Sequence, residues 1–343
     1  MSLNGLGPRS TRVAVIGAGS MGTNHLRVLH DFDDDAVQLV GVAESHEPTL
    51  AKAVSRYHIP GFVDYRQLIR ETCPDLVSIV VPTHQHFTVA VHALEHGVHA
   101  LIEKPITTTV EEATTLSELA RACGRMIAVG HIERFNPAVL ALKQLVAEGS
   151  LGQIYCLHAR RIGPFPSRIR DVGVVLDLAT HDLDAMRYIV DSEPERAYAE
   201  TRQCTGQEHE DMLFGLVRFK TGAVGMLDVN WLTPTKVREL SVTGEYGMYL
   251  VNYLSQELYF YENDYTPVGW DTLRSQVGVS EGTMTRLKIQ RQEPLRAEYE
   301  NVINAVRQGA TPAVTAEDGI AVLRLAHELI GSTRVGGVVP CTA

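Results

Sequence analysis

The sequence is poor in cysteine and has no long hydrophobic run. Its five cysteines are scattered, odd in number and without C-x-x-C spacing, which argues against a disulfide framework and against a cysteine zinc site. No window reaches about 18 apolar residues, and the opening stretch MSLNGLGPRST lacks the apolar core of a signal peptide. We therefore expect a cytoplasmic protein with reduced thiols.

Positive charge is also in deficit. The chain has 31 lysines and arginines against 41 acidic residues, which gives a net charge of -10. A nucleic-acid or anionic membrane surface needs a positive footprint, so neither is an expected partner. The length of 343 residues predicts about two domains, and the composition is that of an ordinary globular protein. These bulk properties favour small-molecule chemistry.

The first part of the chain alternates short apolar runs with helical spacing. The runs RVAVIG, VQLVGVAE, DLVSIVVP, VHALIEKP and MIAVGH are mostly apolar throughout, as strands are when helices cover both faces of their sheet. Helical spacing occurs between them at residues 20–30, 47–57, 85–96 and 110–122. This pattern predicts a Rossmann-like, doubly wound parallel sheet in a domain of residues 1–130.

The texture changes after about residue 152. Longer alternating segments such as GQIYCLHARRI, MLFGLVRFK and GAVGMLDVNWL are separated by turn residues, as antiparallel hairpins require. Helical spacing returns at residues 293–307 and 315–332. We expect residues 131–343 to form an α+β domain with a large, mostly antiparallel open sheet.

A glycine motif follows the first expected strand. VAVIGAGSMG contains the pattern G-x-G-x-x-G, formed by Gly17, Gly19 and Gly22 and enclosing Ser20 and Met21. Between a strand and a helix, this pattern lets a dinucleotide pyrophosphate approach the backbone at the positive end of the helix. Glu44 ends the next strand, where a carboxylate bonds the adenosine ribose and repels a 2′-phosphate. The expected cofactor is NAD rather than NADP.

Lys104 stands at the end of another expected strand, in LIEKPITTT. Pro105 restricts the backbone there, so the lysine is either positioned or merely a charge at a strand end. Ligands of open α/β sheets bind at the carboxyl edge, which should bring Pro82 and Thr83 of VVPTHQH beside Lys104. His84 and His86 alone make a weak metal site, so we expect no metal.

The segment VVLDLATHDLDAMRYIV supplies a second candidate group. Asp177, His181 and Asp184 have helical spacing, which would place the histidine between two carboxylates that orient its tautomer. A surface histidine beside a helix acid is the alternative. In combination with Lys104 on a nucleotide-binding half, the catalytic interpretation is favoured.

The motifs GAGSMG, VPTHQH, EKP, VGHIERFNP and LDLATHDLD together resemble the Gfo/Idh/MocA family of glucose-fructose oxidoreductases and inositol dehydrogenases. The resemblance spans nearly the whole chain and implies a Rossmann domain followed by a domain with an open sheet. It implies that Lys104, Asp177 and His181 are catalytic. It also implies that Pro82, Thr83, His86 and Glu103, with Lys104, lie on the cofactor side.

A narrower resemblance concerns VGHIERFNPAV and RRIGPFPSRIRDVGVVLDLATHD, which are similar to the branch that oxidises nucleotide-linked amino sugars, notably UDP-N-acetylglucosamine 3-dehydrogenases. It implies substrate contacts from Arg134, Arg161 and Arg168, with Asp177 and His181. Arginines suit a diphosphate, although any one of them could instead belong to a solvated face. The rivals are an inositol 2-dehydrogenase or other polyol dehydrogenase, and a non-catalytic NAD-binding regulator.

The expected reaction is hydride transfer from a sugar secondary alcohol to NAD. His181 fits the base and Lys104 the group that polarises the reacting oxygen, although the two could exchange these roles. We also expect a homodimer or homotetramer through an apolar sheet face that carries Leu227, Val229 and Trp231. Burial of these three residues against the domain's own helices is the alternative.

Overall fold

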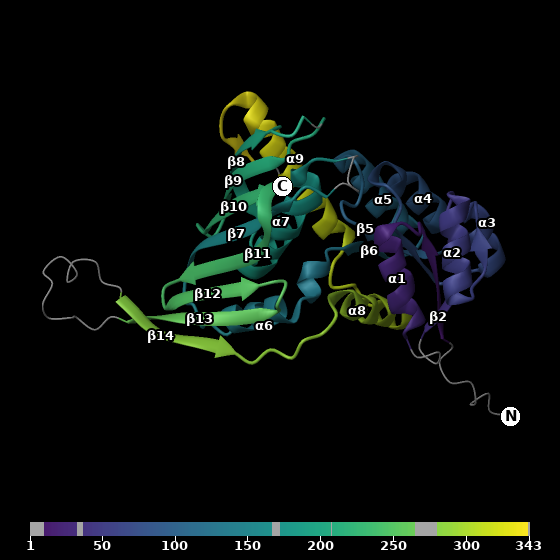
Figure 1. Cartoon of the computed structure of the whole chain (residues 1–343), viewed down its shortest axis with the longest axis horizontal. Coiled ribbons are helices and arrows are strands. Elements are labelled where there is room, and N and C mark those ends of the chain that lie inside the picture. Colours follow the sequence, from purple (N-terminus) through teal and green to yellow (C-terminus); the bar gives the residue numbers. More distant parts are fainter. Residues whose placement is uncertain (1–9, 33–36, 167–171, 207, 265–279, 342–343) are drawn as a thin grey trace, which may run out of the picture. The chain divides into compact units, whose positions relative to one another are not determined.

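The computed structural model describes residues 10–32, 37–166, 172–206, 208–264 and 280–341. They form two compact units (Figure 1). The first contains the described residues up to Ile132 and a returning segment, Glu293–Leu323, and the second contains the described residues of Glu133–Gln292 and those from Arg324 onward. The predicted boundary after residue 130 places this returning segment in the second domain. In the structure, the segment packs with the first unit.

The first unit is built on six parallel strands in the order β3-β2-β1-β4-β5-β6. This is the doubly wound order in which the chain reverses direction beside β1, between β1 and β4. The predicted parallel sheet is confirmed. The strands are β1 (Thr11–Ile16), β2 (Val37–Ala43), β3 (Gly61–Phe62), β4 (Leu76–Ile79), β5 (His99–Glu103) and β6 (Ile127–Gly130).

Helices fill the connections of this sheet. They are α1 (Ser20–His30), α2 (Glu47–Tyr57), α3 (Tyr65–Thr72), α4 (Thr83–Glu95) and α5 (Val110–Ala122). The returning segment contributes α8 (Pro294–Gln308), which buries Leu295, Tyr299 and Val302 in the core that also contains Val13 and Leu26. This apolar face explains why α8 belongs to the first unit.

The second unit is built on nine described strands in the order β14-β13-β12-β11-β7-β10-β9-β8-β15. Neighbours are antiparallel except β7 and β10. The strands are β7 (Ile154–Pro164), β8 (Pro194–Arg202), β9 (Met212–Phe219), β10 (Val224–Asn230), β11 (Leu232–Gly244), β12 (Gly247–Asn252), β13 (Glu257–Asp264), β14 (Ser280–Leu287) and β15 (Val339–Pro340). The predicted mostly antiparallel open sheet is confirmed.

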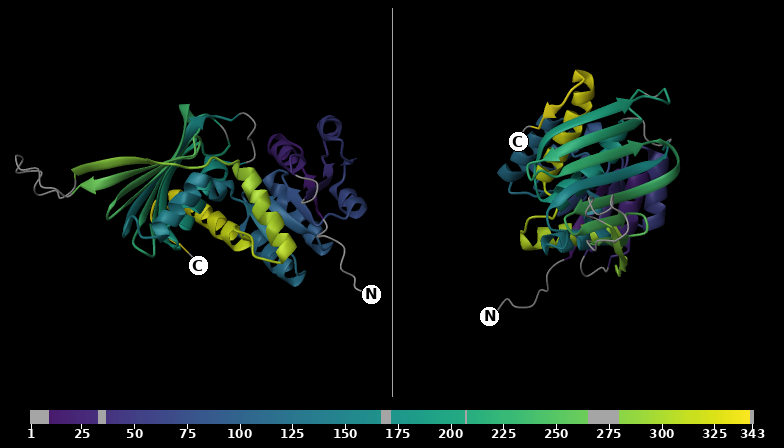
Figure 2. Two further views of the ribbon diagram at one scale, coloured as in Figure 1. Left: turned by 90° about the horizontal axis from the view of Figure 1, so that it is seen from below. Right: turned by 90° about the vertical axis from the view of Figure 1, so that its left-hand side faces the viewer.

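Helices cover one face of this sheet, and Figure 2 shows the strands of the other face toward the viewer in its right-hand view. The helical elements of the second unit are η1 (Ile132–Phe135), α6 (Pro137–Ala147), the π-helical segment η2 (Val175–Ala179) and α7 (Thr180–Val190), with the C-terminal part of α9 (Ala316–Val335). Across the described ranges, none of the helices is both long and apolar enough to cross a membrane.

The three apolar residues expected on the uncovered face of the large sheet lie on the face that the helices cover. Leu227, Val229 and Trp231 are 2%, 0% and 5% exposed. Leu227 lies beside Gly215 of the neighbouring strand, against which Leu329 of α9 also packs. Alternation along β9 and β10 instead exposes Phe214, Leu216 and Met226, in the same part of the sheet.

Candidate active site

The glycine loop joins β1 to α1 in the geometry that its sequence predicts. Gly17 has φ +100°, and a Cβ there would lie 2.4 Å from the carbonyl oxygen of Val80. A Cβ at Gly22 would lie 2.1 Å from the Gly17 oxygen, whereas one at Gly19 would meet no atom within 4 Å. Gly17 and Gly22 permit close packing, and Gly19 leaves the start of α1 open to an anion.

Glu44 follows β2 and is bound to the same loop. Its Oε2 accepts a hydrogen bond from the Ala18 backbone at 2.8 Å, and its Oε1 accepts one from the His46 backbone at 2.9 Å. These two bonds orient a carboxylate at the edge of the sheet. Each oxygen of an ionised carboxyl has two acceptor positions, so the group can still accept hydrogen bonds from a ribose.

A cavity of about 320 Å³ opens at this edge within the first unit. It is lined by the glycine loop, by Glu44 and by the residues after β4, including Pro82. Thr83 begins α4, directly after this lining residue. Tyr65 and Gln85 also line the cavity, and sequence reasoning missed both: α3 was not predicted, and Gln85 was not singled out within the VPTHQH motif. This lining includes Gly17, Gly19 and Glu44, the residues predicted to hold the adenosine end of a dinucleotide.

Lys104 directly follows β5 and is half-buried. Its backbone N–H donates to Oε2 of Glu103 at 3.2 Å, and the Lys104–Pro105 peptide bond is cis. The ring of His86 lies 2.9 Å from the carbonyl oxygens of both Pro105 and Val81. Burial lowers the pKa of His86, which favours a neutral ring, and a neutral ring can donate to only one of these two oxygens. Its cofactor role stays a prediction.

Asp177 and His181 occupy the helical segment of the second unit, but on two kinds of helix. Asp177 lies in η2, which a π turn makes wider than an α-helix, and His181 lies in the first turn of α7. Asp177 is buried, and its backbone N–H donates to the Gly173 oxygen at 3.0 Å. The segment therefore presents an acid and an imidazole four residues apart.

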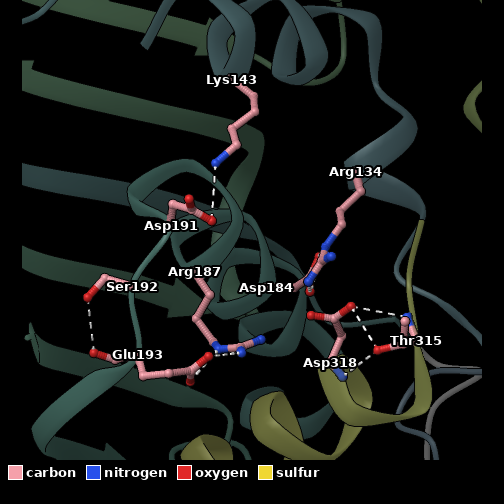
Figure 3. A network of polar contacts seen from close by, with 9 residues as sticks. All are labelled: Arg134, Lys143, Asp184, Arg187, Asp191, Ser192, Glu193, Thr315 and Asp318. Carbon is pink, nitrogen blue, oxygen red and sulfur yellow. Dashed lines mark hydrogen bonds and ion pairs between the residues drawn. The ribbon is translucent and has the colours of Figure 1, made fainter. Parts of the chain in front are cut away.

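Asp184, the second carboxylate expected beside His181, pairs with an arginine. It is fully buried and accepts hydrogen bonds from Arg134 Nε and Nη2 at 2.6–3.0 Å (Figure 3). This two-oxygen pairing engages both carboxylate oxygens with a guanidinium. Asp184 therefore anchors Arg134, and the roles of Asp177 and Asp184 toward His181 stay predictions.

The arginines expected to contact the substrate have buried carboxylate partners. Arg161 pairs with Asp182 at 2.7 Å and with Glu133 at 3.0 Å, and it is 4% exposed. Burial opposes its charge, but the two carboxylates outweigh this effect and raise the pKa of Arg161. Such pairs favour a structural role for Arg134 and Arg161, whose substrate contacts stay a prediction. Arg168 lies outside the described residues.

Sequence reasoning also missed Arg238 of β11. This half-buried side chain donates through Nη1 to the Ile162 oxygen at 2.6 Å. Burial and then the charge of Arg161 lower its pKa to about 10, so it is charged at neutral pH. A single arginine on an alternating strand carries no sequence signal. Among the described residues, no group of three or more His, Cys, Asp and Glu could hold a metal ion.

Comparison with known proteins agrees with this geometry. Residues 11–131 match the family model of an oxidoreductase family with an NAD-binding Rossmann fold, and residues 139–250 match the Gfo/Idh/MocA C-terminal domain. The UDP-N-acetylglucosamine 3-dehydrogenase of Acidithiobacillus ferrooxidans is 30% identical over 86% of this chain and 88% of its own. Its solved structure matches 95% of this chain and 98% of its own with a TM-score of 0.83.

Two further proteins extend the comparison. The inositol 2-dehydrogenase of Acidothermus cellulolyticus is 32% identical over 71% of this chain and 69% of its own. The WlbA dehydrogenase of Chromobacterium violaceum, solved with NADH and UDP-GlcNAcA, is 25% identical with a TM-score of 0.82, covering 97% of this chain and 96% of that one. The glycine loop, the glutamate after β2, the EKP segment and both matching domains identify the chain as an NAD-binding oxidoreductase of the Gfo/Idh/MocA family.

Proposed function

We propose that the protein oxidises a secondary hydroxyl of a nucleotide-linked amino sugar, with NAD as the hydride acceptor. The observation that carries the proposal is the extent of the similarity to UDP-N-acetylglucosamine 3-dehydrogenase, which covers 86% of this chain and so includes most of the second unit. The similarity to the WlbA dehydrogenase solved with a UDP-sugar supports the same substrate class.

The cofactor assignment uses residues of the first unit. Gly17, Gly19, Ser20, Met21 and Gly22 would hold the pyrophosphate at the start of α1. Glu44 would bond the adenosine ribose, and its negative charge disfavours a 2′-phosphate. Pro82, Thr83, His86, Glu103 and Lys104 would line or support the path toward the nicotinamide. When bound, NAD supplies the hydride acceptor.

The chemistry uses three side chains. Lys104 donates a hydrogen bond to the reacting hydroxyl oxygen, and His181 accepts the proton that must leave as the C–H bond breaks. Asp177 orients the imidazole and stabilises its charged form. Because a lysine and a histidine can both transfer protons, the acid and base roles could be exchanged between Lys104 and His181.

Recognition of a diphosphate requires a cationic group that can reach it. Arg134 and Arg161 are engaged in buried ion pairs, so we propose that they shape the substrate pocket rather than contact the phosphates. Arg238 is half-buried and charged, which makes it a candidate for anion binding. Arg168 keeps its proposed substrate contact.

The second candidate function is an inositol or other polyol dehydrogenase, favoured by the 32% identity to an inositol 2-dehydrogenase. We further propose a cytoplasmic homodimer or homotetramer that pairs through the open face of the large sheet. The exposed side chains of Phe214, Leu216 and Met226 support this interface in place of Leu227, Val229 and Trp231.

Thermal-shift measurements test the substrate class without a known assay. A ligand that binds only the folded state raises the melting temperature by mass action. With saturating NAD present, we expect UDP-N-acetylglucosamine to raise the melting temperature more than myo-inositol does. UDP alone is the control for the nucleotide part. A larger shift with myo-inositol would favour the polyol dehydrogenase, and no shift with NAD itself would contradict the cofactor assignment.

A further inference from the structure

Behind Lys104, a continuous chain of hydrogen bonds runs through the first unit. Glu103 Oε1 lies 3.0 Å from His25 Nε2, and His25 Nδ1 lies 2.7 Å from the hydroxyl of Tyr299. That hydroxyl lies 2.6 Å from Ser78 Oγ. The four residues come from β5, α1, α8 and β4, so elements far apart in the sequence meet in one polar chain.

This chain of hydrogen bonds is buried along almost its whole length. His25, Tyr299 and Ser78 are 0% exposed, and the side chain of Glu103 is 12% exposed. Polar groups removed from water in this way stabilise a fold only when every donor finds an acceptor. The hydroxyls of Ser78 and Tyr299 and both ring nitrogens of His25 meet this condition. Their arrangement is therefore specific rather than incidental.

The direction of the bonds follows from the charge of Glu103. Burial opposes the charge, but the hydrogen bond from His25 and the charge of Lys104 outweigh it, so the pKa of Glu103 lies below its ordinary value. A carboxylate only accepts, so Nε2 of His25 must donate. Nδ1 can then accept from Tyr299, and Tyr299 from Ser78, in one consistent order.

Glu298, the neighbour of Tyr299 on α8, is a second buried carboxyl group near Glu103. It is 1% exposed, and neither of its carboxyl oxygens has a hydrogen-bond partner among the described residues. Burial and then the charge of Glu103 raise its pKa well above the ordinary value. The two acids therefore differ: burial favours the protonated form of Glu298, whereas its neighbours favour the charged form of Glu103 next to Lys104. The titratable groups coupled to Glu103 are His25, Lys104, His86, Glu298 and Tyr299.

Glu103 also connects this chain of hydrogen bonds to the backbone of Lys104, because its second oxygen accepts the Lys104 N–H at 3.2 Å. Gly130 of β6 leaves the necessary space, since a Cβ there would lie 3.1 Å from the Glu103 carboxyl carbon. We propose that His25, Tyr299 and Ser78 are positioning residues that hold the Glu103 carboxylate against the Lys104 amide and thereby fix the backbone that carries the reactive lysine. The catalytic part of this inference rests on the proposed function.

Four variants separate positioning from general stability. His25→Leu removes the donor to Glu103, whereas His25→Gln can keep an N–H near the position of Nε2. Tyr299→Phe removes one hydroxyl from the chain with almost no change of shape. Tyr57→Phe is the matched control, because this buried phenol of the same unit bonds only the Thr23 oxygen, at 3.4 Å.

The first readout is the titration of Glu103 in cofactor-free protein, followed by ¹³C NMR of glutamate carboxyls and assigned with Glu103→Gln. The His25 bond lowers the pKa of Glu103, so we expect the titration to move to higher pH in His25→Leu, by about one unit. His25→Gln and Tyr299→Phe should show smaller shifts, and Tyr57→Phe none. An unchanged titration in both His25→Leu and Tyr299→Phe would overturn the proposal, even if one of these proteins folds poorly.

The second readout is steady-state kinetics with NAD and the substrate identified by binding. We expect His25→Leu to lower kcat by about 10–100-fold, as a misplacement of about 1 Å can do, with KM for NAD nearly kept. The acid limb of the pH profile should move to higher pH, because Glu103 loses its charge more easily. His25→Gln should recover most of kcat. A lower melting temperature with an unmoved pH profile would show a purely structural role and contradict the proposal. The carboxyl titration needs no activity, so a wrong substrate would leave it intact.

Discussion

Two carboxylates in the first unit and two in the second are held in different ways. In the first unit, Glu44 and Glu103 stand at strand ends and accept hydrogen bonds from backbone amides or from a histidine. In the second, Asp182 and Asp184 lie within α7 and accept from arginines. Glu44 and Glu103 lie at the edge where a ligand would bind, whereas Asp182 and Asp184 are each paired with a buried guanidinium. This difference supports the proposed assignment of Glu44 and Glu103 to the site and of Asp182 and Asp184 to its support.

The largest expected effect is at Lys104. Lys104→Ala should lower kcat by about 10³-fold, because it removes the group proposed to polarise the reacting oxygen. The dissociation constant of NADH, measured by fluorescence titration, should stay nearly unchanged, since the adenosine contacts lie elsewhere. Lys143→Ala, at a surface ion pair with Asp191, is the control. Near-normal turnover of Lys104→Ala would remove the lysine from the mechanism.

The supporting ion pairs should affect stability more than chemistry. Arg134→Ala leaves Asp184 as a buried carboxylate without its guanidinium, which costs about 3–5 kcal/mol of unfolding free energy. Arg121→Ala breaks an exposed pair with Glu317 and should cost at most about 1 kcal/mol. Urea denaturation measures both. Equal, small losses of unfolding free energy would show that the ion pair of Arg134 is not structural. They would favour a substrate contact for this arginine.

Glu44 should affect the choice of cofactor. Glu44→Ala removes the proposed charged acceptor of the ribose hydroxyls, worth about 1.5–3 kcal/mol, so KM for NAD should rise about tenfold or more. The preference for NAD over NADP should fall because the repulsion of a 2′-phosphate is lost. Kinetics with both cofactors measure the ratio. An unchanged ratio would mean that another group discriminates between them.

The smallest expected effect concerns a side chain that bonds only its own helix. Thr109 and Glu112 form a capping box at the start of α5, so Thr109→Ala should cost about 1 kcal/mol of stability and leave kcat unchanged. Thr114→Ala, on the exposed face of the same helix, should change stability less. Thermal unfolding followed by circular dichroism compares the two. A marked loss of kcat in Thr109→Ala would contradict this prediction and show that the start of α5 affects the proposed catalytic EKP segment.

Local patterns predicted much of the first unit. The expected helices at residues 20–30, 47–57 and 110–122 agree with α1, α2 and α5, because strong amphipathic spacing and clear turns bound them. The glycine geometry followed from a motif with a physical mechanism. The helix α3 was missed because it has only eight residues, too few for a periodic signal.

Packing between residues far apart in the sequence could not be predicted from local patterns. The return of residues 293–323 to the first unit depends on the core contacts of Tyr299 and its neighbours, which no local pattern encodes. The partners of Arg134 and Arg161 likewise lie 50 and 21 residues away. Alternation located an apolar face but did not say which face the helices cover, so Leu227, Val229 and Trp231 were assigned to the wrong side of the sheet.

The most direct test of the account is the rate of NADH formation at 340 nm with a panel of sugars. We predict NAD-dependent turnover of UDP-N-acetylglucosamine that is lost in Lys104→Ala and is much slower with free N-acetylglucosamine or myo-inositol. Turnover of myo-inositol at a higher kcat/KM than that of the nucleotide sugar would contradict the proposed substrate class. Turnover of the nucleotide sugar that survives Lys104→Ala would contradict the proposed mechanism.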